Sequence, residues 1–141
     1  MRAAAENLTP VTLELGGKSP AIIGPQVLSA GAFDKAVERI VVGKCLNAGQ
    51  TCIAPDYVLL PAGQEQAFVD AARRVVAACY PAIGSTPDYT AVLNERHYAR
   101  LCGYLDDARA QGAEVLELAP GVAADAATQR LPPLALLKVS D

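Results

Sequence analysis

Short runs of branched apolar residues alternate along this chain with longer stretches in which apolar residues recur every three to four positions. Runs of the first kind are typical of buried strands, and the recurrence in the second kind is typical of amphipathic helices. Strands that alternate with helices are connected by crossovers and pair in parallel. The sequence therefore predicts an α/β fold with a mostly parallel sheet and flanking helices. The predicted strands cover residues 11–15, 57–60, 114–118 and 134–139.

Three stretches predict helices that each turn one apolar face toward a core. The third is the best delimited, because Asn94 can cap its start and Gly112 can end it. Exposed connections are expected at residues 81–87 and 119–121. The apolar faces are Val37, Ile40, Val41 and Cys45 in the first helix, Phe68, Ala71, Ala72, Val75 and Cys79 in the second, and Tyr98, Leu101, Cys102, Leu105 and Ala108 in the third.

Composition limits both the number of domains and the class of partner. With 141 residues, of which 52% are hydrophobic and 19% charged, the chain has material for one core and one domain, residues 1–141. A formal net charge of -3 and no basic run give no electrostatic reason to expect nucleic acid or a membrane as partner. No apolar stretch reaches the roughly 18 residues that span a bilayer, and a signal-peptide core is missing. We therefore expect a cytoplasmic protein.

The cysteines show no metal-binding spacing. They lie at positions 45, 52, 79 and 102 without a Cys-x-x-Cys pair, and His97 is the one histidine of the sequence. We therefore expect no metal site, and free thiols rather than disulfides. Cys45, Cys79 and Cys102 lie on apolar helix faces and are assigned to packing. Cys52 alone lies in a polar, glycine-bearing stretch.

Cys52 is the candidate nucleophile. The thiolate is the reactive form of cysteine, and a polar, partly exposed setting favours it over a buried one. Gly49 permits a sharp turn that brings backbone N–H groups close to a substrate. A loop cysteine without function is the alternative that position alone leaves open.

Glu14 is the candidate base. It interrupts an apolar strand pattern and precedes two glycines, so we expect its carboxylate at a strand end, where α/β sheets build their sites. Partial desolvation there would raise its pKa toward neutrality, which suits a base that deprotonates water. A solvated glutamate on an edge strand is the alternative, and the presence of Cys52 favours the base.

Three further motifs lead to no site. Gly17, Lys18 and Ser19 resemble the end of a phosphate-binding loop, but Thr12 stands where that motif needs its first glycine. A Gly-x-Gly-x-x-Gly dinucleotide fingerprint is also missing from the sequence. His97 lies beside two arginines in a predicted helix and is interpreted as a solvated surface residue.

Two motifs together resemble the signatures of a known family. Residues 13–20, LELGGKSP, and residues 47–52, NAGQTC, are similar in wording and order to the glutamate and cysteine signatures of the NAD(P)-dependent aldehyde dehydrogenases. The similarity runs through the whole chain and includes residues 131–133, LPP. Around Cys52 the wording looks most like that of coniferyl aldehyde dehydrogenases, which act on aromatic and other hydrophobic aldehydes.

The resemblance implies a role for each signature residue. Cys52 would attack the aldehyde carbon to give a thiohemiacetal, and its backbone N–H would form part of the oxyanion hole. Glu14 would activate the water that hydrolyses the later thioester. The main chain at Leu15 and Gly16 would lie against the nicotinamide end of NAD or NADP. The family also implies a small-molecule aldehyde substrate and a homo-oligomer of the full-length enzyme.

Parts of the family pattern are missing from the chain. A large cofactor-binding region and an oxyanion-hole asparagine should precede the glutamate motif, and a Glu-x-Phe-Gly-Pro segment should follow Asp141. The sequence thus predicts a partial catalytic domain, inactive alone and prone to associate through exposed apolar faces and strand edges. Two alternatives are a noncatalytic fragment that binds a full-length homologue and a cysteine-dependent hydrolase or acyltransferase.

Overall fold

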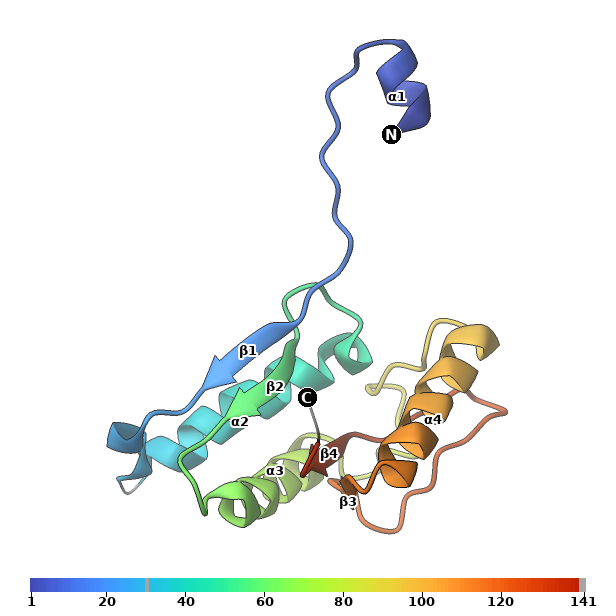
Figure 1. The fold of residues 1–141 in the computed structure, drawn as a ribbon. Coiled ribbons are helices and arrows are strands. Elements are labelled where there is room, and N and C mark those ends of the chain that lie inside the picture. Colours follow the sequence, from blue (N-terminus) through green and yellow to red (C-terminus); the bar gives the residue numbers. More distant parts are fainter. Residues whose placement is uncertain (30, 140–141) are drawn as a thin grey trace.

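The computed structural model of the protein describes residues 1–29 and 31–139. Figure 1 shows that the chain before the first strand extends away from the remaining elements and carries a short helix at its end. In chain order the elements are α1 (Arg2–Glu6), β1 (Ser19–Ile22), the short helix η1 (Pro25–Leu28), α2 (Ala32–Cys45), a second short helix η2 (Leu46–Gly49), β2 (Pro55–Leu59), α3 (Glu65–Cys79), α4 (Glu95–Ala110), β3 (Glu114–Glu117) and β4 (Leu134–Leu137).

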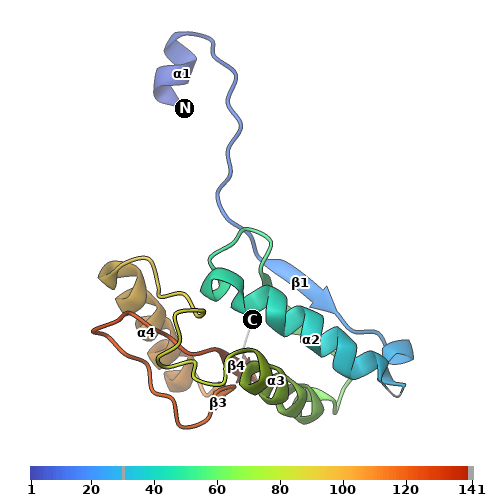
Figure 2. The same ribbon diagram turned by 180° about the vertical axis from the view of Figure 1, so that it is seen from behind.

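β1 and β2 form a parallel pair that is connected by a crossover through α2. The register pairs Pro20 with Tyr57 and Ile22 with Leu59. α2 covers one face of this pair, because it lies behind the strands in Figure 1 and in front of them in Figure 2. The opposite face of the pair is exposed, and we call its four residues the open face: Pro20, Ile22, Tyr57 and Leu59.

The core is centred on the packing of α2 against α3. Val37 of α2 and Val69 and Val76 of α3 are fully buried. Val37 lies on the apolar face predicted for its helix. In α3, Val69 and Val76 replace the predicted Phe68 and Val75, which are only partly buried. The same cluster continues to Tyr89 and Leu118, so one core reaches from the parallel pair into the second half of the chain. A hydrogen bond of 3.0 Å from the Tyr89 hydroxyl to the carbonyl of Leu131 adds to this connection.

The second half of the chain pairs α4 with an antiparallel ribbon. β3 and β4 pair from Glu114 opposite Leu137 to Glu117 opposite Leu134. α4 begins at an Asn94 cap, whose side-chain oxygen accepts a hydrogen bond of 3.0 Å from the N–H of His97.

The predicted α/β class, the three helices and three of the four strands are confirmed. The observed bounds of β2, β3 and β4 all lie within two residues of those predicted, and β4 ends at Leu137 rather than 139. Gly112 follows the end of α4 with a left-handed φ of 89°. The alternation of elements did not predict that β3 and β4 would be antiparallel.

The predicted strand at residues 11–15 is wrong. This segment is extended but unpaired, Val11 and Leu13 are half-exposed, and Leu15 is 88% exposed. An apolar alternation forms a strand only where a neighbouring strand accepts its hydrogen bonds, and here the first pairing partner of β2 is Ser19.

Burial of Cys79 was also wrongly predicted. Its thiol is exposed because Cys79 is the last residue of α3, where the helix leaves the core, whereas Cys45 is buried and Cys102 is partly buried.

Candidate active site

A left-handed turn leads from α2 to Cys52. Asn47 and Ala48 have φ values of 51° and 53°, and Gly49 follows with a φ of 78°. A Cβ at Gly49 would press on Lys44 as well as strain the backbone, which explains the glycine at this position. The chain then turns again, with the N–H of Ala54 donating to the carbonyl of Thr51, and Cys52 is exposed in this second turn.

The glutamate motif lies on the extended segment that enters β1. Glu14 and Leu15 are exposed, and Gly16 has a φ of 97° with open space where a side chain would stand. The Glu14 carboxylate takes part in none of the side-chain hydrogen bonds or ion pairs found among the described residues. It therefore lies on an exposed segment before β1 rather than at the carboxyl end of a strand.

The two motifs meet at their backbones. Gly17 lies so close to Cys52 that a Cβ at Gly17 would overlap the carbonyl oxygen of Cys52. Lys18 directly follows Gly17, and its ammonium forms an ion pair with the carboxylate of Asp56, four residues after Cys52. The structure thus brings the segments of Glu14 and Cys52 together although they are separated by the whole of α2.

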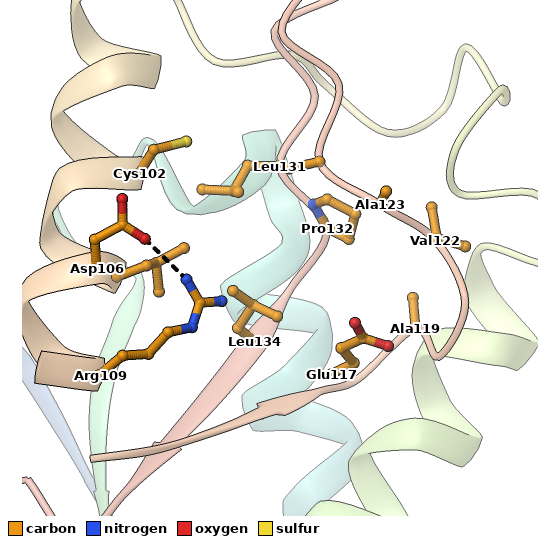
Figure 3. Close-up of a pocket in the computed structure, with 12 residues that line it drawn as sticks. Cys102, Asp106, Arg109, Glu117, Ala119, Val122, Ala123, Leu131, Pro132 and Leu134 are labelled. Carbon is orange, nitrogen blue, oxygen red and sulfur yellow. Dashed lines mark hydrogen bonds and ion pairs between the residues drawn. The ribbon is translucent and has the colours of Figure 1, made fainter. Parts of the chain in front are cut away.

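Two clefts lie elsewhere on the molecule. One of about 200 Å³ is bounded by α4, the ribbon and the loop after β3 (Figure 3). Asp106 and Arg109 form an ion pair of 3.1 Å on its wall, and the Glu117 carboxylate accepts from the N–H of Gly121. The other, of about 420 Å³, lies beside the end of α3. Neither is lined by Glu14 or Cys52.

Cys45 is buried, whereas Cys52 is exposed. Desolvation, with a smaller contribution from the nearby Cys79, raises the pKa of the Cys45 thiol to about 11, and Lys44 only partly opposes this. Cys45 is therefore a neutral packing group at neutral pH.

The described residues hold no cluster of three or more His, Cys, Asp or Glu side chains that could bind a metal ion. Within that same part of the chain, every helix is too short or too polar to cross a membrane.

Comparison with known proteins decides the family. Residues 1–137 match the aldehyde dehydrogenase family. The chain belongs to this family. That assignment agrees with the two signatures around Glu14 and Cys52, which the fold brings into backbone contact.

Curated family relatives are similar along the chain. It is 55% identical over 141 residues to a probable coniferyl aldehyde dehydrogenase of Pseudomonas aeruginosa, and 48% identical over 143 residues to the coniferyl aldehyde dehydrogenase of a Pseudomonas species. A mouse aldehyde dehydrogenase family 3 member A2 is 44% identical over 89% of the chain. The chain spans only 28% and 29% of the length of the two bacterial relatives.

Sequence reasoning missed the residues that hold the site together. Lys18 and Gln50 lie inside the two family motifs, but their partners, Asp56 and residues 91–93, lie about 40 positions away in each case. The sequence signals only that the Lys18 ammonium and the Gln50 amide each need a hydrogen-bonding or charged partner.

Proposed function

We propose that this chain carries the nucleophile and the base of an NAD(P)-dependent aldehyde dehydrogenase and forms part of its catalytic domain. The contact between Gly17 and the Cys52 carbonyl is the observation that supports this most strongly, because it joins the two signature segments. Family membership supports aldehyde oxidation as the reaction class.

Cys52 forms the covalent bond to substrate in this proposal. Its thiolate attacks the aldehyde carbon, and a thiohemiacetal results, with the backbone N–H of Cys52 facing the developing oxyanion. The exposure of Cys52 in a turn leaves its sulfur accessible to a substrate. After oxidation to the thioester, water that Glu14 deprotonates attacks the acyl carbon, and the Cys52 thiolate leaves.

The cofactor is NAD or NADP, which accepts a hydride when bound. The open main chain at Leu15 and Gly16 fits the approach of a flat ring, because Gly16 has no neighbour within 4 Å of where a Cβ would stand. Leu15 and Gly16 would therefore contact only the nicotinamide end of the cofactor. The rest of the cofactor would bind to parts of an aldehyde dehydrogenase that this chain does not contain.

The substrate in this proposal is a hydrophobic, aromatic aldehyde such as coniferyl aldehyde. The names of two relatives, which are 55% and 48% identical to this chain, support this choice. The complete enzyme would be a cytoplasmic homo-oligomer.

The function is tested by placing residues 1–141 in the corresponding position of the Pseudomonas aeruginosa relative. We expect NAD(P)H formation with coniferyl aldehyde, and its loss in Cys52→Ser. Glu14→Gln should form NAD(P)H once per site and then stall, because only thioester hydrolysis needs the base. Cys79→Ser and Glu38→Gln are matched controls that keep full turnover. Full turnover in Cys52→Ser would reject the proposal.

The 141-residue chain alone should form no NAD(P)H, since it offers only the nicotinamide end of a cofactor site. The absorbance of the reduced nicotinamide checks this expectation. Sustained turnover by the pure chain would contradict it.

The open face supports a second candidate function, in which the chain binds a full-length homologue without catalysis. Ile22 is 73% exposed and Leu59 is 51% exposed on the open face. Co-elution of the chain with the intact relative, lost in Ile22→Lys, would favour this function. A cysteine hydrolase remains a third hypothesis, for which sustained esterase turnover that is lost in Cys52→Ser would be the sign.

A further inference from the structure

We propose that Gln50 is a positioning residue, which fixes the backbone of Cys52 by fastening its loop to the segment before α4. This inference rests on the proposed function, because it concerns how the nucleophile of that function is held.

The Gln50 amide makes a two-way connection to a distant part of the chain. Its oxygen accepts a hydrogen bond of 2.9 Å from the N–H of Leu93, and its nitrogen donates one of 3.1 Å to the carbonyl of Ala91. A side-chain amide that meets both an N–H and a C=O of one segment imitates a neighbouring strand. The segment itself is anchored, because the N–H of Val92 donates to the carbonyl of Gln129.

The same amide also closes the turn before Cys52. Its nitrogen donates to the carbonyl of Asn47 at 3.0 Å, and the Asn47 amide donates back to the carbonyl of Gln50 at 3.2 Å. These bonds span Asn47 and Ala48, whose left-handed φ values are unfavourable for residues with a Cβ. Without these hydrogen bonds, we expect the turn to relax.

Relaxation of the turn would affect the backbone of Cys52, because Cys52 is the second residue after Gln50. On its other side the carbonyl of Cys52 lies against Gly17. The backbone of Cys52 is thus held between Gly17 and the Gln50 connection, and the direction of its N–H depends on both. A correctly directed N–H stabilises an oxyanion but has no effect on a displacement reaction that forms none.

Two reagents on the 141-residue chain separate these effects. p-Nitrophenyl acetate acylates a thiolate: the sulfur bonds to the carbonyl carbon through an oxyanion, the ester C–O bond breaks, and p-nitrophenolate leaves. Iodoacetamide alkylates the thiolate with loss of iodide and no oxyanion. Mass spectrometry gives both rates at Cys52 and at the exposed Cys79, which serves as an internal reference. We define the acylation preference as the acylation-to-alkylation ratio at Cys52 divided by that at Cys79.

We expect an acylation preference of roughly fivefold or more in the wild type. Gln50→Met should bring it near one while Cys52 alkylation changes less than about twofold, since exposure of the thiol is retained. Gln50→Glu keeps the acceptor for Leu93 but loses the donor, and should fall in between. Gln66→Met removes another exposed amide, one that donates to Asp70 at 2.9 Å, and should match the wild type.

Hydrogen exchange provides the structural check. The amide of Leu93 should exchange faster in Gln50→Met and not in Gln66→Met, while the amides of α2 stay protected in both. If Gln50→Met does not fold, Gln50→Glu decides the question alone.

A wild-type preference that survives in Gln50→Met or Gln50→Glu would overturn the inference and leave the proposed function standing. A wild type without any preference would overturn the inference as well. Loss of the proposed function is seen separately, as failure of the chimeric enzyme to oxidise coniferyl aldehyde.

Discussion

At the scale of single residues, Gly17 is decisive because it has no side chain. The carbonyl oxygen of Cys52 occupies the space that a Cβ at Gly17 would need. This glycine therefore sets how closely the two signature segments approach. The sequence shows a Gly16-Gly17 pair, but only the fold shows which of the two is needed for packing and against what.

We expect Gly17→Ala to lower the free energy of unfolding by about 1 to 3 kcal/mol, because backbone must shift to remove the overlap. Gly103→Ala is the matched control of opposite sign. Gly103 lies inside α4 with open space around it, so alanine there should stabilise by about 0.5 to 1 kcal/mol. Urea unfolding of both variants checks the pair. Equal stability of Gly17→Ala and wild type would show that the contact is not tight.

At the scale of elements, the helices could be predicted and the first strand could not. Helical spacing and the Asn94 cap are local, so α2, α3 and α4 follow from their own residues. A strand also needs a neighbouring strand to pair with, and the local sequence does not identify that neighbour. The run at 11–15 looks like a strand but has none, whereas Ser19–Ile22, with a proline inside it, pairs with β2. The signature residues were predicted from the family resemblance, and the bonds that hold them were not.

The Asn94 cap should contribute measurably to α4. Asn94→Ala removes the acceptor of the His97 N–H and should cost about 1 kcal/mol in the free energy of unfolding. Asn7→Ala is a suitable control, because Asn7 bonds within α1, outside the core. Thermal unfolding followed by circular dichroism should therefore shift only for Asn94→Ala. A shift of the same size in Asn7→Ala would argue against a specific cap.

The end of α2 makes stability depend on pH in the alkaline range. Burial raises the pKa of Cys45 from 9.0 to about 11, so below pH 9 the thiol is neutral in both states. Between these two pKa values the Cys45 thiol ionises only in the unfolded chain. The free energy of unfolding should therefore fall by up to about 1.4 kcal/mol per pH unit. The fall should level off above the folded pKa.

Urea unfolding between pH 8 and 11, under reducing conditions, measures this fall. Cys45→Ala should have a smaller slope with pH, whatever its absolute stability, and Cys79→Ala should keep most of it. Identical slopes in wild type and Cys45→Ala would contradict the assignment.

At the scale of the whole molecule, one core joins both halves while the open face stays uncovered. α2 and α3 bury their apolar residues together with Tyr89 and Leu118, yet Ile22 and Leu59 face outward from β1 and β2. Exposed apolar side chains beside unpaired strand edges favour contact between copies.

Self-association of the chain should therefore depend on the open face. Ile22→Lys should shift the sedimentation of the chain toward the monomer, because a charge would be buried in the contact. Tyr104→Lys is the control, since Tyr104 is exposed on α4, away from β1 and β2. Equal association of the two variants would place the contact elsewhere.

The parallel pairing of β1 and β2 has a consequence for the tolerance of length changes. Each signature runs directly into one strand of the pair, so an amino acid inserted between Gly17 and Ser19 would shift Glu14 along its path by about 3.3 Å relative to Cys52. Extra residues between the end of η1 and the start of α2 would leave that spacing untouched. Natural variants should accordingly gain or lose length in the crossover and keep the short stretches that lead into the strands constant.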